Sequence, residues 1–471
     1  MLRVILASLI FASALAAQDN HYWTHQFGTR ASLMGGAVVG GVNDTSAVYY
    51  NPARLGWIDN DSLKVSADGY QLAILTIQDG AGKGEDLTST QGDIVPLAAS
   101  GVYTFPQPRL ALGFHILARQ YSDISVSTRR EAFQNVIDDT RSPGDEDFIG
   151  SFSFNSDVEE YWAGLGFGWA PLDWLSIGIT HFGALRFDTQ DLSITTRAVN
   201  TAGETFGADN IAGWDYWNVR MLWKGGLALE FGGLKMGFTV TTQSLNLFGG
   251  ATVRRQISVD DLDIDGDGAG NDFEANDRRD GVSTRFRSPW SFATGVDYDF
   301  GPVLLAIAAE WFLPVGRYAA AKPTGDKAFY RGGISTENSK DLLTVYDGRR
   351  GAFNIAIGLE TEFSGDWSGF WSMRRDAGAD YLGHGDDLHF GISTWDLFHF
   401  ATGISFTTRQ DDGTPKHELM IGLQLAVGAD RTVQPVSFDD PRENRLLTGQ
   451  TRGTDISYFA ISLIVGYTYY F

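Results

Sequence analysis

The sequence predicts an all-β fold, a transmembrane antiparallel β-barrel of about 14 to 16 strands. Three observations predict it: apolar and polar residues alternate, short turns alternate with long connections, and aromatic residues gather near strand ends. The chain has 471 residues, of which 56 are glycine and 13% are aromatic, and this composition suits a large half-buried sheet. It contains no cysteine and has a net charge of −22. These two values argue against disulfide scaffolds, zinc–thiolate sites and nucleic-acid binding.

The first 17 residues predict a secretory signal peptide. Arg3 supplies the positive start, residues 4–16 supply the apolar stretch, and Ala14-Leu15-Ala16 fits the cleavage pattern. No later run is apolar for long enough to form a membrane-spanning helix. We therefore expect a signal peptide at 1–17, an N-terminal segment at 18–60 and a barrel at 61–471.

Period-two alternation is clearest at the end of the chain. Residues 459–471 place large apolar side chains on one face and Ser462, Gly466 and Thr468 on the other. A soluble β-sandwich would turn the apolar face inward, whereas a membrane barrel turns it outward to lipid. The pattern recurs at 234–243, 303–311 and 353–363.

The lengths of the connections favour the barrel, because outer-membrane barrels have short turns at one end and long loops at the other. The first strands are expected at 62–77, 94–105 and 109–129, and residues 429–454 are either one connection or a loop with a short strand near 432–438. Short turns are expected at 106–108, 171–173, 232–233, 301–302 and 364–366. Long loops are expected at 130–150, 198–213, 259–284, 317–348 and 375–387.

Tryptophans near the expected strand ends predict rings at the membrane–water boundaries. The residues concerned are Trp162, Trp169, Trp174, Trp217, Trp223, Trp290, Trp311, Trp367 and Trp371. The C-terminal pattern Gly466, Tyr469, Phe471 is similar to the signal that outer-membrane barrels present to their assembly machinery, with Ile464 where a polar residue is usual. We therefore expect the protein in the outer membrane of a Gram-negative-type bacterium, in contact with lipid and lipopolysaccharide.

Residues 18–60 do not alternate. Small residues at 31 and 35–37 allow close backbone packing, and Asn51-Pro52 predicts a junction between extended chain and a turn. A barrel of this size has a lumen that wall side chains alone do not fill. A compact segment ahead of the barrel therefore predicts either a periplasmic piece or a plug of the lumen.

The segment from Gly35 to Leu55 resembles the N-terminal hatch of the outer-membrane long-chain fatty-acid and aromatic-hydrocarbon transporter family (FadL/TodX type). The resemblance implies a 14-stranded barrel plugged by the hatch, in which hydrophobic molecules enter from outside and leave sideways through a gap in the wall. Arg54 stands where the family often has glycine. Similar hatches occur in barrels used for secretion and attachment. The hatch motif comprises Gly35, Gly36, Asp44, Ser46, Tyr50, Asn51, Pro52 and Ala53.

The expected function is passive uptake of a hydrophobic molecule such as a fatty acid, lipid or aromatic hydrocarbon. No catalytic motif for hydrolysis or phosphate transfer is found, so an enzyme is not expected. The alternatives are a structural or secretion-associated barrel that binds partner proteins, and a water-filled porin. Candidate collecting residues are Phe133, Val136, Ile137, Leu342, Leu343, Val345 and Tyr346, and candidate carboxylate-binding residues are Arg119, Arg129, Arg130, Arg349 and Arg350.

An aspartate-rich stretch at 260–277 resembles a calcium-binding loop. Counted from Asp261, acids stand at positions 1, 3, 5 and 12 and Gly266 at position 6, where the sharp turn needs glycine. Flanking helices are absent, and position 12 is aspartate. We expect either weak calcium binding, with a dissociation constant of roughly 10⁻⁴ to 10⁻³ M, or a plain acidic loop. The candidate ligands are Asp261, Asp263, Asp265, Asp267 and Asp272.

Overall fold

The computed structural model describes residues 21–105, 109–137, 140–264, 267–325, 329–331, 342–381, 395–443 and 446–471. The expected signal peptide lies outside these residues. The helices are α2 (Thr29–Leu33), α3 (Ala47–Tyr50), η1 (Pro52–Trp57) and η2 (Pro441–Glu443). Among the described residues, no helix is long and apolar enough to cross a membrane.

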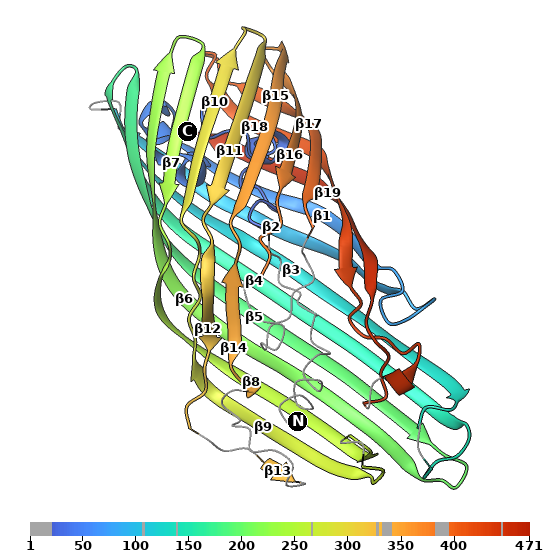
Figure 1. Ribbon diagram of the computed structural model, residues 1–471. Helices are drawn as coiled ribbons and strands as arrows, with labels where there is room; N and C mark the ends of the chain where they lie inside the picture. The colour runs from blue at the N-terminus through green and yellow to red at the C-terminus, as the bar shows by residue number, and fades with distance from the viewer. Residues whose placement is uncertain are drawn as a thin grey trace.

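Strands form nearly all of the wall (Figure 1). They are β1 (Ser62–Ile77), β2 (Leu87–Phe105), β3 (Leu110–Gln134), β4 (Glu146–Leu172), β5 (Leu175–Val199), β6 (Thr205–Phe231), β7 (Leu234–Thr241), β8 (Leu245–Leu262), β9 (Asn271–Ser283), β10 (Ser291–Asp299), β11 (Val303–Phe312), β12 (Val315–Ala321), β13 (Phe329–Arg331), β14 (Val345–Arg349), β15 (Ala352–Ser364), β16 (Trp367–Asp376), β17 (Leu397–Arg409), β18 (Pro415–Val433) and β19 (Gly453–Tyr470).

The sheet closes into a 14-stranded antiparallel barrel, because β1 pairs with both β2 and β19. The circuit runs through β1 to β7, then β10, β11 and β15 to β19. Strands β8, β9, β12 and β14 continue the wall beyond short interruptions, and β12 and β14 pair separately as a hairpin. Closure leaves no sheet edge exposed to lipid, so an all-β membrane-spanning structure becomes possible.

The exposed side chains of β4 change from mainly apolar to mainly polar along one uninterrupted strand. From Leu172 to Tyr161 the exposed residues of the alternation are mainly apolar, with Leu165 70% exposed. From Glu159 to Asp147 most exposed residues are polar, and buried phenylalanines face inward. Apolar residues face lipid in the first part and a protein core in the second, so the strand leaves the membrane near Tyr161.

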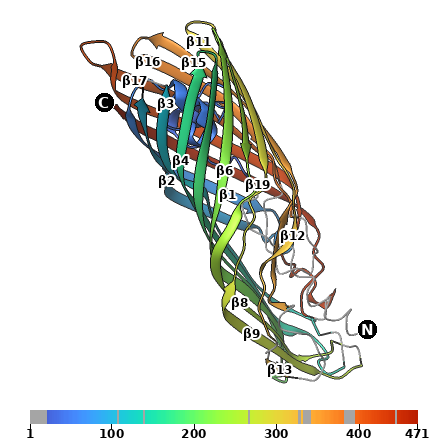
Figure 2. The ribbon, with the colours of Figure 1, turned by 90° about the vertical axis from the view of Figure 1, so that its left-hand side faces the viewer.

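We name the second part of the wall the extension, which comprises residues 121–134, 146–159, 189–199, 205–215, 252–262 and 271–280. Figure 2 shows these strands continuing well beyond the rest of the barrel, at the end opposite to the short turns. The expected long loops at 130–150, 198–213 and 259–284 are wrong in large part, because strands β3 to β6, β8 and β9 occupy much of these ranges. Polar outward residues made these strands look like loops in the sequence.

Some of the other expected strand and turn boundaries agree with the structure, and others do not. The first strand agrees at Ser62–Ile77, whereas β2 begins earlier than expected, at Leu87. Short turns join β4 to β5, β6 to β7, β10 to β11 and β15 to β16, and the expected turn at 106–108 lies outside the described residues. Of the two alternatives for residues 429–454, the extra short strand near 432–438 is wrong, because β18 ends at Val433 and no strand lies between it and β19 in the described residues.

Two apolar cores fill the barrel. One lies in the extension and includes Phe148, Phe152 and Phe154. The other lies at the short-turn end and includes Leu33 and Leu55 of the N-terminal segment. The blue segment inside the barrel in Figure 1 is this N-terminal part.

Candidate functional site

Residues 21–57, which we name the luminal segment, pack against the inner face of the wall. The Asn51 side-chain amide donates to the carbonyls of Val39, at 3.0 Å, and Leu227 of β6, at 3.2 Å. Its carbonyl accepts from the backbone N–H of Ala53 at 3.1 Å and so caps η1. A Cβ at Gly178 of β5 would lie 2.3 Å from the Pro52 carbonyl, so the wall needs glycine there to let the segment approach.

Two arginines of the luminal segment pair with carboxylates of the wall. Arg54 lies 2.8 Å from Glu230 of β6, and Arg30 lies 2.6 Å from Glu360 of β15. Both arginine side chains are almost fully buried. The family's usual glycine is thus replaced by a residue that fixes the segment to the wall.

Asp44 forms a third ion pair, 2.6 Å from Lys64 of β1. Burial raises the pKa of the Asp44 carboxyl, but the Lys64 ammonium and the Ser46 hydroxyl outweigh burial and hold this pKa below its usual value. The Ser46 backbone N–H also donates to Asp44, at 2.9 Å. The hatch-motif residues Asp44 and Ser46 therefore form one anchored cluster.

The remaining hatch-motif residues shape the chain. Gly35 and Gly36 have φ values of 64° and 84°, which favour glycine. The Tyr50 hydroxyl donates to Gln26 at 2.8 Å and accepts from the Phe27 backbone at 2.9 Å. These contacts are local and concern packing, with no ligand role required.

A cavity lies beside the luminal segment. We name it the luminal cavity. Aromatic and aliphatic side chains form part of its lining, among them Tyr49, Trp162, Leu222 and Phe312. Charged residues complete it: Arg119, Glu160, Lys224, Arg287, Glu310 and Arg349.

Two cations of the luminal cavity have no carboxylate within ion-pair distance in the described part of the chain. Arg119 is 9% exposed and its guanidinium lies 5.5 Å from the Trp162 ring. Lys224 is 5% exposed, and its Nζ lies 4.5 Å from the Tyr49 ring. Burying a cation out of contact with an anion costs free energy, so a negative group bound beside this pair would be stabilised.

The two carboxylates of the same cavity are already satisfied. Glu160 pairs with Arg220 and with Arg186, the latter at 3.2 Å. Glu310 accepts from the indole N–H of Trp23 at 2.7 Å and from the Ser291 hydroxyl at 2.6 Å. Both carboxylates therefore have their own partners, and neither forms an ion pair with Arg119 or Lys224.

The wall parts between β2 and β3. These strands pair only from Ala98↔Leu117 to Phe105↔Leu110, although β1 follows β2 to Leu87 and β4 follows β3 to Gln134. A bulge between Ala118 and Gln120 marks the point of parting. It leaves the adjacent residues Ala118 and Arg119 both buried, which interrupts the alternation of β3.

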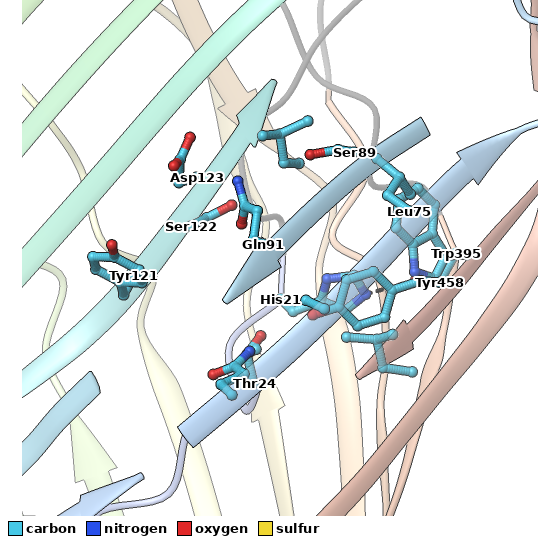
Figure 3. A pocket seen from close by; sticks show the side chains of 14 residues that line it. His21, Thr24, Leu75, Ser89, Gln91, Tyr121, Ser122, Asp123, Trp395 and Tyr458 are labelled. Atoms are coloured by element: carbon cyan, nitrogen blue, oxygen red, sulfur yellow. Dashed lines mark hydrogen bonds between the residues drawn. The ribbon is translucent and has the colours of Figure 1, made fainter. Parts of the chain in front are cut away.

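A second cavity lies at this parting, and we name it the wall cavity (Figure 3). Polar residues of the flanking strands, including Gln91 and Ser122, line one side. Leu75, Trp395 and Tyr458 supply apolar surface. His21 lines both cavities, so the wall cavity and the luminal cavity meet at that residue.

The structure brings two of the five candidate arginines, Arg119 and Arg349, to the luminal cavity. The others lie elsewhere, where Arg129 pairs with Glu131, Arg130 with Asp439 and Arg350 with Asp380. Among the candidate collecting residues, Phe133 is 66% exposed. Val136, Ile137, Leu343 and Val345 were expected on collecting loops, but they are buried in the core of the extension.

Sequence reasoning missed Lys224 and the satisfied carboxylates of the cavity. Lys224 stands at an inward position of β6 between residues that face lipid. A charged residue on the lumen side of a predicted barrel strand is the signal that could have identified it. Trp162 was expected at the membrane boundary, but it is 6% exposed and lines the luminal cavity.

The expected calcium loop is only partly described, because Asp265 and Gly266 lie outside the described residues. Asp261 pairs with Arg141 at 2.6 Å, and the Asp263 carboxylate accepts from the backbone N–H groups of Asp267 and Gly268, each at 3.1 Å. No group of three metal-binding side chains converges among the residues described. Calcium binding at this loop stays a prediction.

The C-terminal residues end the last strand of the barrel. Tyr469 and Phe471 are 40% and 64% exposed on the outer surface. Gly466 faces inward, where a Cβ would overlap Thr29 of α2. The role of this pattern in assembly stays a prediction.

The architecture matches solved structures of outer-membrane channels. A Pseudomonas aeruginosa FadL homologue is 12% identical, with a TM-score of 0.56, over 95% of this chain and 99% of that one. The chain has the FadL-type barrel fold. The toluene transporters TodX of P. putida and TbuX of Ralstonia pickettii are each 12% identical, with TM-scores of 0.55 and 0.53, over 94% of this chain and 98% of each of theirs.

The FadL-type fold confirms the expected multi-pass outer-membrane barrel. No protein-family description and no curated protein sequence matches the chain. At these identities the likeness establishes the fold alone. Function must therefore be argued from the cavities of this chain.

Proposed function

We propose that the protein passively takes up hydrophobic molecules across the outer membrane and binds them in the luminal cavity. Its proposed ligands have a long apolar body and a carboxylate head, as fatty acids do. The observation that supports this is the pair of buried cations, Arg119 and Lys224, beside the rings of Tyr49 and Trp162. The rings suit an apolar chain, and the cations suit its anionic head.

Neutral aromatic hydrocarbons are the second candidate class. The similar structures include proteins described as toluene transporters. A neutral ligand would leave the buried Arg119 and Lys224 without a direct ion pair, so the acid is favoured. The partner-binding barrel and the porin gain no support from the cavities.

Binding of labelled palmitate to the purified barrel in detergent tests the proposal. We expect saturable binding that a long-chain acid displaces better than the alcohol of equal length. Absence of saturable binding would refute it. A preference for toluene over the acid would favour the second class.

A further inference from the structure

A row of exposed apolar side chains marks the outer end of the paired barrel on one side. Four register partners make up the row, one each on β7, β10, β11 and β15: Val240, Phe292, Trp311 and Phe353. Each of them is at least 40% exposed, and each of the four strands reaches only one residue beyond the row. Outer-membrane barrels keep their short turns in the periplasm, and this row lies at the other end of these strands. The row therefore marks the outer boundary of the apolar part of the membrane.

Three exposed arginines lie just beyond this row, on the side of the extension. Arg285 and Arg287 belong to the connection between β9 and β10, and Arg317 belongs to β12. The Thr284 hydroxyl donates to the carbonyl of Trp217 at 2.8 Å, and the Trp217 side chain is 41% exposed on the barrel surface. Exposed tryptophan rings favour the level of the lipid headgroups. Arg285, the neighbour of Thr284, therefore lies at that level.

The β12–β14 hairpin holds the three arginines together. The guanidinium carbons of Arg285 and Arg287 lie 6.0 Å and 5.0 Å from the centroid of the Tyr318 ring. The Nε of Arg285 also donates to a backbone carbonyl of β12, at 2.8 Å. Arg317 directly precedes Tyr318, and its guanidinium carbon lies 3.6 Å from the centroid of the Tyr346 ring in β14. One hairpin therefore gathers three guanidinium groups at the surface.

These residues form what we name the outer arginine group: Arg285, Arg287 and Arg317. The group is a basic patch on a chain whose net charge is −22. Arg285 and Arg287 form no ion pair with a carboxylate in the part of the chain that the structure describes. Exposed arginines elsewhere in the extension do form such pairs, as Arg129 and Arg278 do. The Asp347 carboxylate of β14 is buried and accepts from a tyrosine hydroxyl of β12 at 2.6 Å. The group therefore offers donors and positive charge to an anion at headgroup level.

We propose that the outer arginine group binds the phosphate groups of lipopolysaccharide in the outer leaflet of the membrane. A guanidinium group can bind a phosphate through two parallel hydrogen bonds, which makes arginine well suited to this anion. The lipid part of lipopolysaccharide carries its phosphates at headgroup level, and its acyl chains would lie against the apolar row of Phe292 and Trp311. A phosphate held there would fix the depth of the barrel, with the extension standing outside the membrane. This site lies on the outer surface and goes beyond the uptake proposed above.

Binding of fluorescent diphosphorylated lipid A, the lipid part of lipopolysaccharide, to the purified protein in detergent tests the site. The variant R285Q/R317Q removes two of the guanidinium groups, and Arg287 is kept because it also lines the luminal cavity. The matched control is R129Q/R278Q, which removes two exposed arginines of the extension. We expect R285Q/R317Q to bind lipid A at least roughly tenfold more weakly than the wild type. The control should bind like the wild type.

The conservative variant R285K/R317K should keep part of the affinity, because lysine retains the charge but lacks the planar fork of donors. Equal binding of lipid A by the wild type and R285Q/R317Q would overturn the proposal. An equal loss in R129Q/R278Q would also overturn it, because the effect would then be one of overall charge. Should R285Q/R317Q fail to fold, the wild type still decides: lipid A without phosphates should bind much more weakly than the phosphorylated form, and equal binding of the two would refute the site.

Two competitors identify the source of the phosphate. Inorganic phosphate at the same concentration should not displace lipid A, because it has no acyl chains to lie on the apolar row. Displacement by inorganic phosphate would mean that the site serves a free ion, and the assignment to lipopolysaccharide would fail. Phosphatidylglycerol should displace lipid A only weakly, since it carries a single phosphate. Equal displacement by phosphatidylglycerol would mean that any anionic headgroup suffices, and it would overturn the proposal in the same way.

Discussion

Replacing Lys224 with methionine should weaken binding of an acid while making the barrel more stable. Lys224 is 5% exposed, and its Nζ lies 4.5 Å from the centroid of the Tyr49 ring. That contact contributes about 0.5 to 2 kcal/mol, less than the several kcal/mol that burial of an ion costs. Methionine keeps the length of the side chain and removes the charge. We therefore expect a higher melting temperature for the K224M barrel in detergent.

The affinity of K224M for the acid should fall while its stability rises. A hydrogen bond between Lys224 and a bound carboxylate would contribute about 1.5 to 3 kcal/mol, so K224M should bind the acid roughly 10- to 150-fold more weakly. The alcohol of equal chain length should bind the variant and the wild type equally. Fluorescent-ligand displacement in detergent measures both. R129M is the matched control, because Arg129 is exposed and pairs with Glu131 away from the cavity.

Two outcomes would refute this reasoning. An equal loss of affinity for acid and alcohol would mean that Lys224 contributes packing and not charge. A lower melting temperature with unchanged affinity would mean that Lys224 stabilises the fold and leaves the ligand untouched. Opposite changes in stability and affinity are the signature of a buried charge kept for a ligand.

Three further predictions concern the luminal segment and the acidic loop. G178V should displace the segment, because a Cβ there would lie 2.3 Å from the Pro52 carbonyl, and bilayer conductance should rise; G183V, with open space around its Cβ, should leave conductance unchanged. Lowering the pH should loosen the luminal segment, since the pKa of Asp44 is held below its usual value. The stability that this ion pair contributes is then fully present above about pH 4 and fades as the pH falls, which hydrogen exchange corrected for intrinsic rates can follow. Calcium should bind the whole protein with a dissociation constant of roughly 10⁻⁴ to 10⁻³ M. In calorimetry it should bind the D263N variant more weakly, and the absence of binding heat with either protein would rule out a calcium site in this loop.

Much of the fold was predictable because its cause is local. Alternation at 459–471 requires only that one face of a strand meets lipid, and the structure confirms the strand at Gly453–Tyr470. The hatch motif is similarly local, since Asn51 caps the turn that follows it. Features of this kind leave a pattern within a few neighbouring residues.

The extension could not be recognised in the same way. Its strands alternate as well, but their apolar residues face a core and their polar residues face water. The sequence pattern of a strand is the same whether its apolar face points inward or outward. Only the packing of distant segments, such as Phe438 against Phe148, decides between the two.

The candidate site depends on residues far apart in the sequence. Arg119 of β3 and Lys224 of β6 come together only when the barrel closes, and Tyr49 joins them from the luminal segment. The parting of β2 from β3 is equally hard to recognise in the sequence, because it depends on the pairing between two strands and not on the pattern within either one. Sequence could nominate Arg119 as a basic residue but gave no ground for preferring it to Arg129.

The bulge of β3 lies beside both cavities. Arg119, the extra residue between Ala118 and Gln120, is buried and lines the luminal cavity. The last pair between β2 and β3, Ala98↔Leu117, lies directly before the bulge, and beyond it the two strands separate. The two apolar cores meet at this level: residues of one line the wall cavity and residues of the other line the luminal cavity. A hydrophobic molecule needs apolar space that is not already filled, and the seam between two packed cores supplies it. The irregular part of β3 thus lies where a buried cation and two cavities are within reach of one ligand.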